Sequence, residues 1–148
     1  MAQAPSNQPH WFALPLLVLG ATGFAAGWLL LALALDRTCS WLALLAALDL
    51  VLLLRLGRWP AGAARLALAV LGTLGVIVMA NGLIAAGQLG KSLGMRPWES
   101  ALRIGPDYAW LLMRMANDHI DLALYAASLL LAAWLGGFSG RRPGPSAR

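Results

Sequence analysis

Four apolar segments, separated by more polar connections, divide the chain. They run over residues 11–35, 41–56, 66–89 and 120–138. A helix needs about 20 mostly apolar residues to cross the roughly 30 Å hydrocarbon core of a bilayer. The first, third and fourth segments come close to this length or exceed it, whereas the second is shorter and contains Asp49. The pattern predicts four transmembrane helices, of which the second is the least regular.

The connection before the fourth segment has a helical pattern of its own. Between residues 97 and 116, apolar side chains recur at helical spacing, and Gly105 and Pro106 divide the pattern into two pieces. We expect a broken amphipathic helix that lies in the membrane interface. Its simplest role is to cover the ends of the four spans, and the alternative is a site for a substrate or a partner.

The composition supports a membrane protein. Hydrophobic residues make up 60% of the 148 residues, charged residues only 11%, and the mean hydropathy is +0.72. Soluble domains carry about 25% charged residues. The sequence therefore predicts an all-α integral membrane protein with one transmembrane domain, residues 11–138. A short polar segment at 1–10 precedes this domain, and a basic tail at 139–148, rich in Gly, Pro and Ser, is expected to be disordered.

The arginines suggest an orientation. Arg55, Arg58 and Arg65 flank the short connection between the second and third segments, and such residues favour retention on the cytoplasmic side. Both termini would then also be cytoplasmic. The richness in Ala, Leu, Gly and Arg, with Lys91 as the single lysine, is typical of GC-rich bacterial genomes. We therefore expect a multi-pass protein of the bacterial inner membrane.

Asp49 is the polar residue that most needs an explanation. An aspartate at the centre of a membrane helix costs about 2.5–3.5 kcal/mol on insertion. Counting residues from the helix ends places Thr73 and Ser128 at a similar depth in the third and fourth segments. One hypothesis is a polar cluster in which Asp49, Thr73 and Ser128 hold three helices together through hydrogen bonds. The other is that Asp49 serves as a proton or cation site.

Glycines suggest how the helices pack. Membrane helices associate closely where small residues let the backbones approach. The first segment has such a stripe, and the third has a second one. Their glycines are Gly20, Gly23 and Gly27, and Gly72, Gly75 and Gly82. We expect the first and third helices to touch through these stripes, although the same residues could serve homodimerisation instead.

The cluster "NDHID" at residues 117–121 suggests a helix start rather than a metal site. Asp118 and Asp121 have the spacing of an N-cap and its third helical position, so both can accept hydrogen bonds from the first amides of the fourth helix. His119 and Asp121 point to different faces of a helix and cannot hold one metal ion together. With a single cysteine, Cys39, the chain has no internal disulfide or cysteine cluster.

These observations favour a small polytopic inner-membrane protein that is not an enzyme. The sequence contains no nucleophile with an adjacent base, no HExxH motif and no phosphate-binding glycine loop, and it predicts no catalytic, cofactor or metal residues. The tail has too few arginines for nucleic acid. We expect the protein to act in the bilayer by association with itself or with other membrane proteins. The alternative is a small transporter or channel protomer that uses Asp49.

Overall fold

The computed structural model describes residues 13–57, 59, 62–96, 99, 102–103 and 105–138, and all regular structure within them is helical. The described helices are α1 (Ala13–Leu35), α2 (Leu42–Leu56), α3 (Ala63–Leu93), α5 (Pro106–Ala116) and α6 (His119–Phe138). The polar segment expected at 1–10 and the tail expected at 139–148 lie outside the described residues, as does part of the segment at 97–116.

Three of these helices are long and apolar enough to cross a membrane. Their candidate spans are Leu14–Leu35, Ala63–Leu93 and His119–Gly137, with 22, 31 and 19 residues. The all-helical structure is therefore consistent with a membrane protein. Helix α2 has 15 residues, a length of about 22 Å at 1.5 Å per residue, and by itself it is shorter than the hydrocarbon core.

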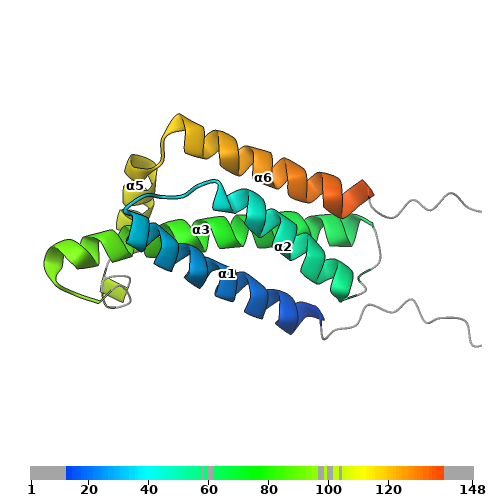
Figure 1. Ribbon diagram of the computed structural model, residues 1–148, viewed down its shortest axis with the longest axis horizontal. Helices are drawn as coiled ribbons and strands as arrows, with labels where there is room; N and C mark the ends of the chain where they lie inside the picture. Colours follow the sequence, from blue (N-terminus) through cyan, green and yellow to red (C-terminus); the bar gives the residue numbers. More distant parts are fainter. Residues whose placement is uncertain are drawn as a thin grey trace, which may run out of the picture.

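Helices α1, α2, α3 and α6 lie side by side along the long axis of the molecule, and α5 lies across one end of them (Figure 1). Helix α1 contacts α2 and α3, and α6 contacts the same two helices. Helices α2 and α3 also contact each other, so they form the central pair of the bundle. We call the end where α1 and α3 finish and α6 begins the α5 end, and the other the opposite end.

Lys91 shows that α1 and α3 run in the same direction. Its Nζ atom, close to the end of α3, donates to the carbonyl oxygen of Leu33 (2.9 Å) and to Oδ1 of Asp36 (2.8 Å) at the end of α1. A cation at a helix C-terminus also interacts favourably with the helix dipole. Because this ion pair is exposed, it adds little stability, but it joins the C-terminal ends of the two helices.

Arg65 joins α3 to α6 at the opposite end. Its side chain is only 5% exposed, and its Nε atom donates to the carbonyl oxygen of Gly136 in the last turn of α6 (2.9 Å). The α6 carbonyls at a helix end lack partners within the helix, so this buried guanidinium supplies one. The start of α3 and the end of α6 therefore lie together.

Small residues line the face of α6 that carries Gly136. Ser128, Ala132 and Gly136 are spaced four apart and are all buried. A Cβ atom added to Gly136 would lie 3.2 Å from Cα of Leu66 and 3.3 Å from Cβ of Ala69. The backbones of α3 and α6 therefore approach closely here, as membrane helices do where small residues meet.

Candidate functional site

A group of polar side chains from four separate parts of the chain meets near the α5 end. Its centre is Tyr125 of α6, which is 8% exposed. Its hydroxyl lies 3.1 Å from Oδ1 of Asn81 on α3, 2.8 Å from Oδ1 of Asn117 at the α5–α6 junction, and 3.3 Å from Oγ of Ser40 in the α1–α2 loop. We call these residues, together with Asp121, the Tyr125 cluster.

Both asparagines are held in one orientation by their own helices. Nδ2 of Asn81 donates to the carbonyl of Ile77 (2.9 Å), and Nδ2 of Asn117 donates to the carbonyl of Met113 (2.7 Å). An amide flipped the other way would place its oxygen against a carbonyl oxygen. Two amide oxygens therefore face the single hydroxyl of Tyr125.

Asp121 links the start of α6 to the α1–α2 loop. Its Oδ2 atom accepts the backbone amide of Asp118 (3.0 Å), and Oδ1 of Asp118 accepts the amide of His119 (2.7 Å). Both carboxylates therefore bind free amides at the beginning of the helix. The other oxygen of Asp121 accepts a hydrogen bond from Oγ of Ser40, a tertiary contact that the capping pattern does not predict.

Trp28 of α1 also contacts the α1–α2 loop. It is 1% exposed, and its indole nitrogen donates to the carbonyl of Thr38 (2.8 Å). Its ring also packs against the ring of Tyr125, with centroids 6.5 Å apart and an angle of 55° between the planes. Tilted aromatic pairs at this distance are favourable. The loop, α1 and α6 are therefore held together around the cluster.

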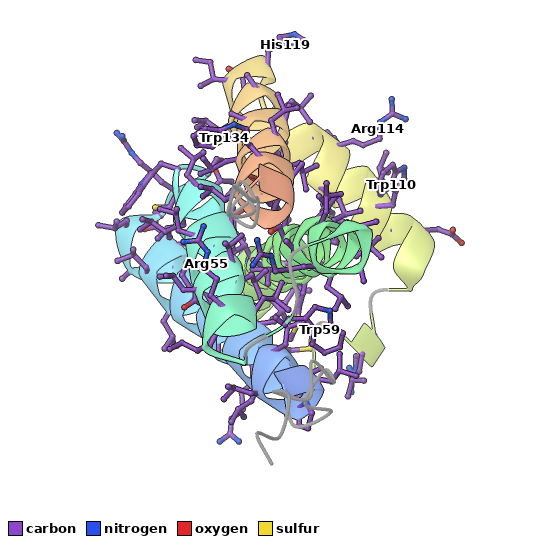
Figure 2. All side chains as sticks on the ribbon, turned by 90° about the vertical axis from the view of Figure 1, so that its right-hand side faces the viewer. Arg55, Trp59, Trp110, Arg114, His119 and Trp134 are labelled. Atoms are coloured by element: carbon purple, nitrogen blue, oxygen red, sulfur yellow. The ribbon has the colours of Figure 1, made fainter. Side chains whose placement is uncertain are left out.

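A cavity of about 460 Å³ opens beside the cluster, between α3, α5 and α6. Asn81, Asn117 and Tyr125 of the cluster are among its lining residues, and the lining surface is mostly apolar. We call it the α5 cavity. Its other lining residues are Ile77, Val78, Trp110, Met113, Arg114, Asp118, His119 and Leu122. Figure 2 shows Trp110 and Arg114 on the outer side of α5 and His119 at the start of α6, all projecting away from the bundle axis.

Asp49 does not meet the hydroxyl groups expected beside it. Oγ1 of Thr73 donates to the carbonyl of Ala69 (2.7 Å), and Oγ of Ser128 donates to the carbonyl of Tyr125 (2.7 Å). Each hydroxyl is therefore satisfied within its own helix. Asp49 is only partly buried at the middle of α2, and no hydrogen bond or ion pair joins it to any of the described residues. Among the described residues, therefore, no hydrogen bond joins Asp49 to Thr73 or Ser128.

The glycines of the two expected stripes have different surroundings. A Cβ atom on Gly20 would overlap the side chain of Leu53, and one on Gly72 would lie 3.3 Å from Leu50. Both glycines therefore pack against leucines of α2 rather than against each other. The other four have open space around the added atom. These are Gly23, Gly27, Gly75 and Gly82.

Helices α1 and α3 instead meet at Gly87, where an added Cβ would lie 3.0 Å from Leu33. The expected contact between the two helices is present, but a glycine outside both stripes contributes to it. Periodicity alone does not show which face of a helix meets a neighbour.

The Tyr125 cluster is built from groups that donate and accept hydrogen bonds. The hydroxyl of Ser40 donates to the carboxylate of Asp121, and among the described residues no hydrogen bond joins it to a histidine. In the described part of the chain, no three or more His, Cys, Asp and Glu side chains are grouped so that they could hold a metal ion. Comparison of the chain with protein-family models, with curated proteins and with solved structures finds no match. The oxygen atoms of the cluster are placed to accept hydrogen bonds from a donor.

Proposed function

We propose that the chain crosses the membrane four times, with α2 as the second span. Because α1 and α3 run in the same direction, the residues between them must return across the bundle. Helix α2 and its flanking residues make that return. Exposed tryptophans also lie near both ends, with Trp41, next to Ser40, and Trp110 of α5 at the α5 end and Trp134 near the end of α6 at the opposite end, which is the distribution of interfacial anchors.

We place α5 in the membrane interface. It lies across the bundle (Figure 1), and large apolar side chains on its surface remain at least half exposed, among them Trp110, Leu111 and Met115. Such a helix is stable where its apolar residues enter the boundary between headgroups and acyl chains.

For orientation, we propose that the opposite end faces the cytoplasm of a bacterial cell, because Arg55 and Arg65 lie there. Introduced cysteines test this. The native thiol of Cys39 is buried, so it is first replaced by alanine. In intact cells with a permeabilised outer membrane, a membrane-impermeant maleimide should label Ser92→Cys at the α5 end. It should label Ala64→Cys only after lysis. The reverse pattern would overturn the orientation, and labelling of both from one side would contradict the four crossings.

The function that we propose is association within the membrane, without catalysis. The observation that carries it is the partly exposed carboxyl of Asp49 at the middle of α2, which has no partner among the described residues. An unpartnered aspartate at this depth costs about 2.5–3.5 kcal/mol. A polar group on a second membrane protein, or on a second copy of this chain, would remove much of that cost.

The open glycines support the same proposal. Gly23 and Gly27 on α1 leave space for another backbone to approach, and close approach is what stabilises helix pairs in lipid. The chain therefore offers both a polar group and small residues to a neighbour.

The test is photocrosslinking in native membranes. A photoreactive amino acid at Leu52, one turn from Asp49 and 54% exposed, should capture a protein partner. The same amino acid at Leu130 of α6, 71% exposed, is the matched control and should capture mainly lipid. Asp49→Leu should lower the yield at Leu52 about three- to tenfold, the range expected for one hydrogen bond between membrane helices. Asp49→Asn should retain most of it.

Two results would change the interpretation. Equal protein capture at Leu52 and Leu130 would contradict association through this face. If Asp49→Asn instead stays assembled but abolishes proton or cation flux into reconstituted vesicles, Asp49 is a transport site, because asparagine keeps the hydrogen bond but cannot release a proton.

A further inference from the structure

The α5 cavity has the size and lining of a ligand site. Its volume of about 460 Å³ lies within the roughly 300–1,000 Å³ of small-molecule pockets, which combine apolar walls with a few polar groups. Asn81, Asn117 and Tyr125 provide those polar groups on one side. None of the residues that carry the proposed association belongs to this cavity, so the two sites are independent.

At Tyr125, two hydrogen-bond acceptors share one donor proton. The hydroxyl of Tyr125 has one proton, yet it faces the amide oxygens of both Asn81 and Asn117. Each of the two side-chain amides directs one of its two protons to a carbonyl, that of Ile77 or of Met113. Among the described residues, no hydrogen bond joins the second proton of either amide to the other amide oxygen. One of the two oxygens is therefore left without a full hydrogen bond.

Ser40 does not supply the missing proton. Its hydroxyl donates to Asp121. Its other neighbour in the cluster is the phenolic oxygen of Tyr125, 3.3 Å from Oγ of Ser40, and not an amide oxygen. A buried acceptor without a donor is unfavourable. Within the described residues, the cluster therefore leaves an amide oxygen that a hydroxyl donor in the adjacent α5 cavity can satisfy.

The remaining walls define the rest of the ligand. Ile77, Val78 and Leu122 are aliphatic, and Met113 adds a flexible side chain that adapts to different shapes. At the rim, the cation Arg114 and the anion Asp118 have opposite charges. A ligand with a strong net charge therefore gains little on entry, whereas an apolar body is accommodated.

We propose that the α5 cavity binds a neutral amphiphile, an apolar chain or ring that ends in a hydroxyl group. The hydroxyl donates its proton to the amide oxygen of Asn81 or Asn117, and the apolar body lies against α3 and the start of α6. Such a molecule could come from the lipid bilayer or from the aqueous phase, and both sources offer the same chemistry.

Photolabelling of the full chain in phosphatidylcholine vesicles tests the proposal. The probes are a diazirine-bearing decanol, its methyl ether, and a short water-soluble diazirine-bearing benzyl alcohol. The decanol should label residues of the cavity such as Trp110, Met113 and Leu122. The ether, which cannot donate, should label them about three- to tenfold less, the difference expected for one hydrogen bond. Stronger labelling by decanol than by the benzyl alcohol would indicate a membrane source, and the reverse an aqueous one.

Two variants test the location. Leu122→Trp should fill the cavity and lower decanol labelling of Met113 at least fivefold by the exclusion of one ligand-sized body. Leu130→Trp is the matched control on α6, since both leucines are more than half exposed, and should leave labelling unchanged. Equal labelling by the alcohol and the ether in the unmodified chain would overturn the proposal. So would the absence of labelled cavity residues, or an equal effect of the two tryptophans.

Discussion

Replacing Gly136 with leucine is expected to destabilise the bundle by about 2–3 kcal/mol, the cost of overpacking a close helix contact. The first added carbon would already lie 3.2 Å from the α3 backbone at Leu66 and 3.3 Å from Ala69. A side chain can avoid such a contact by changing its rotamer, but a backbone atom cannot. Helix α6 would have to move away from α3, and the hydrogen bond from Arg65 to the Gly136 carbonyl would be lost with it. Unfolding in mixed dodecyl maltoside and SDS micelles measures the effect.

Two further variants make this result specific. Gly23→Leu is the same substitution where nothing lies within 4 Å of the added atom, so the unfolding free energy should stay the same or rise slightly through better helix propensity. Ala132→Leu, at a residue with 0% exposure one turn further into α6, should be as harmful as Gly136→Leu. If Gly136→Leu is tolerated and Ala132→Leu is not, the end of α6 is simply fraying. If both are tolerated, the close α3–α6 contact is not important for stability.

Hydropathy predicted where the apolar helices lie, but less well where they end. The segments 41–56 and 120–138 agree with α2 and α6 to within a residue at each end. Helix α3 extends beyond 66–89 at both ends and stops at Gly94, which has a left-handed backbone (φ 67°). Hydropathy reports the part of a helix that suits hydrocarbon, whereas helix ends depend on backbone geometry and on polar contacts such as that of Lys91.

Counting residues from the helix ends suggested Thr73 and Ser128 as neighbours of Asp49, but neither hydroxyl binds it. Depth along a helix leaves the rotation about its axis undetermined, and Thr73 and Ser128 bind carbonyls of their own helices instead. The two glycine stripes were chosen from their spacing, which also leaves the rotation of each helix about its axis undetermined. The tight α3–α6 contact uses Gly136, and Ala132 is fully buried one turn before it, so the useful signal was small size at four-residue spacing rather than glycine itself.

The Tyr125 cluster could not be predicted from local pattern. Ser40 and Asp121 are 81 positions apart, and Asn81 and Tyr125 are 44 apart. The spacing of Asp118 and Asp121 predicted roles at the start of a helix, and both accept backbone amides there. A capping aspartate has two oxygens, however, and the partner of the second depends on how the α1–α2 loop packs, which only the assembled bundle shows.

The contact between Ser40 and Asp121 should make the two residues energetically coupled. Ser40→Ala removes the hydroxyl that donates to Asp121, and hydrogen bonds to charged groups contribute about 1.5–3 kcal/mol. Asp121→Ala removes that bond and also the acceptor for the Asp118 amide, which adds the cost of a lost helix cap, about 0.5–2 kcal/mol. Asp121→Ala should therefore be the more destabilising single change.

A double-mutant cycle isolates the bond itself. Unfolding free energies of the unmodified chain, Ser40→Ala, Asp121→Ala and the double variant should give a coupling energy of about 1–3 kcal/mol, as expected for residues in direct contact. The control cycle pairs Ser40→Ala with Asp118→Ala. Asp118 accepts the amide of His119 and makes no hydrogen bond to Ser40, so this pair should add to within about 0.5 kcal/mol. Additive effects in both cycles would show that the bond from Ser40 to Asp121 does not tie the α1–α2 loop to α6. The loop would then be held by its other contacts, such as the bond from Trp28 to Thr38 and the ion pair of Asp36 with Lys91.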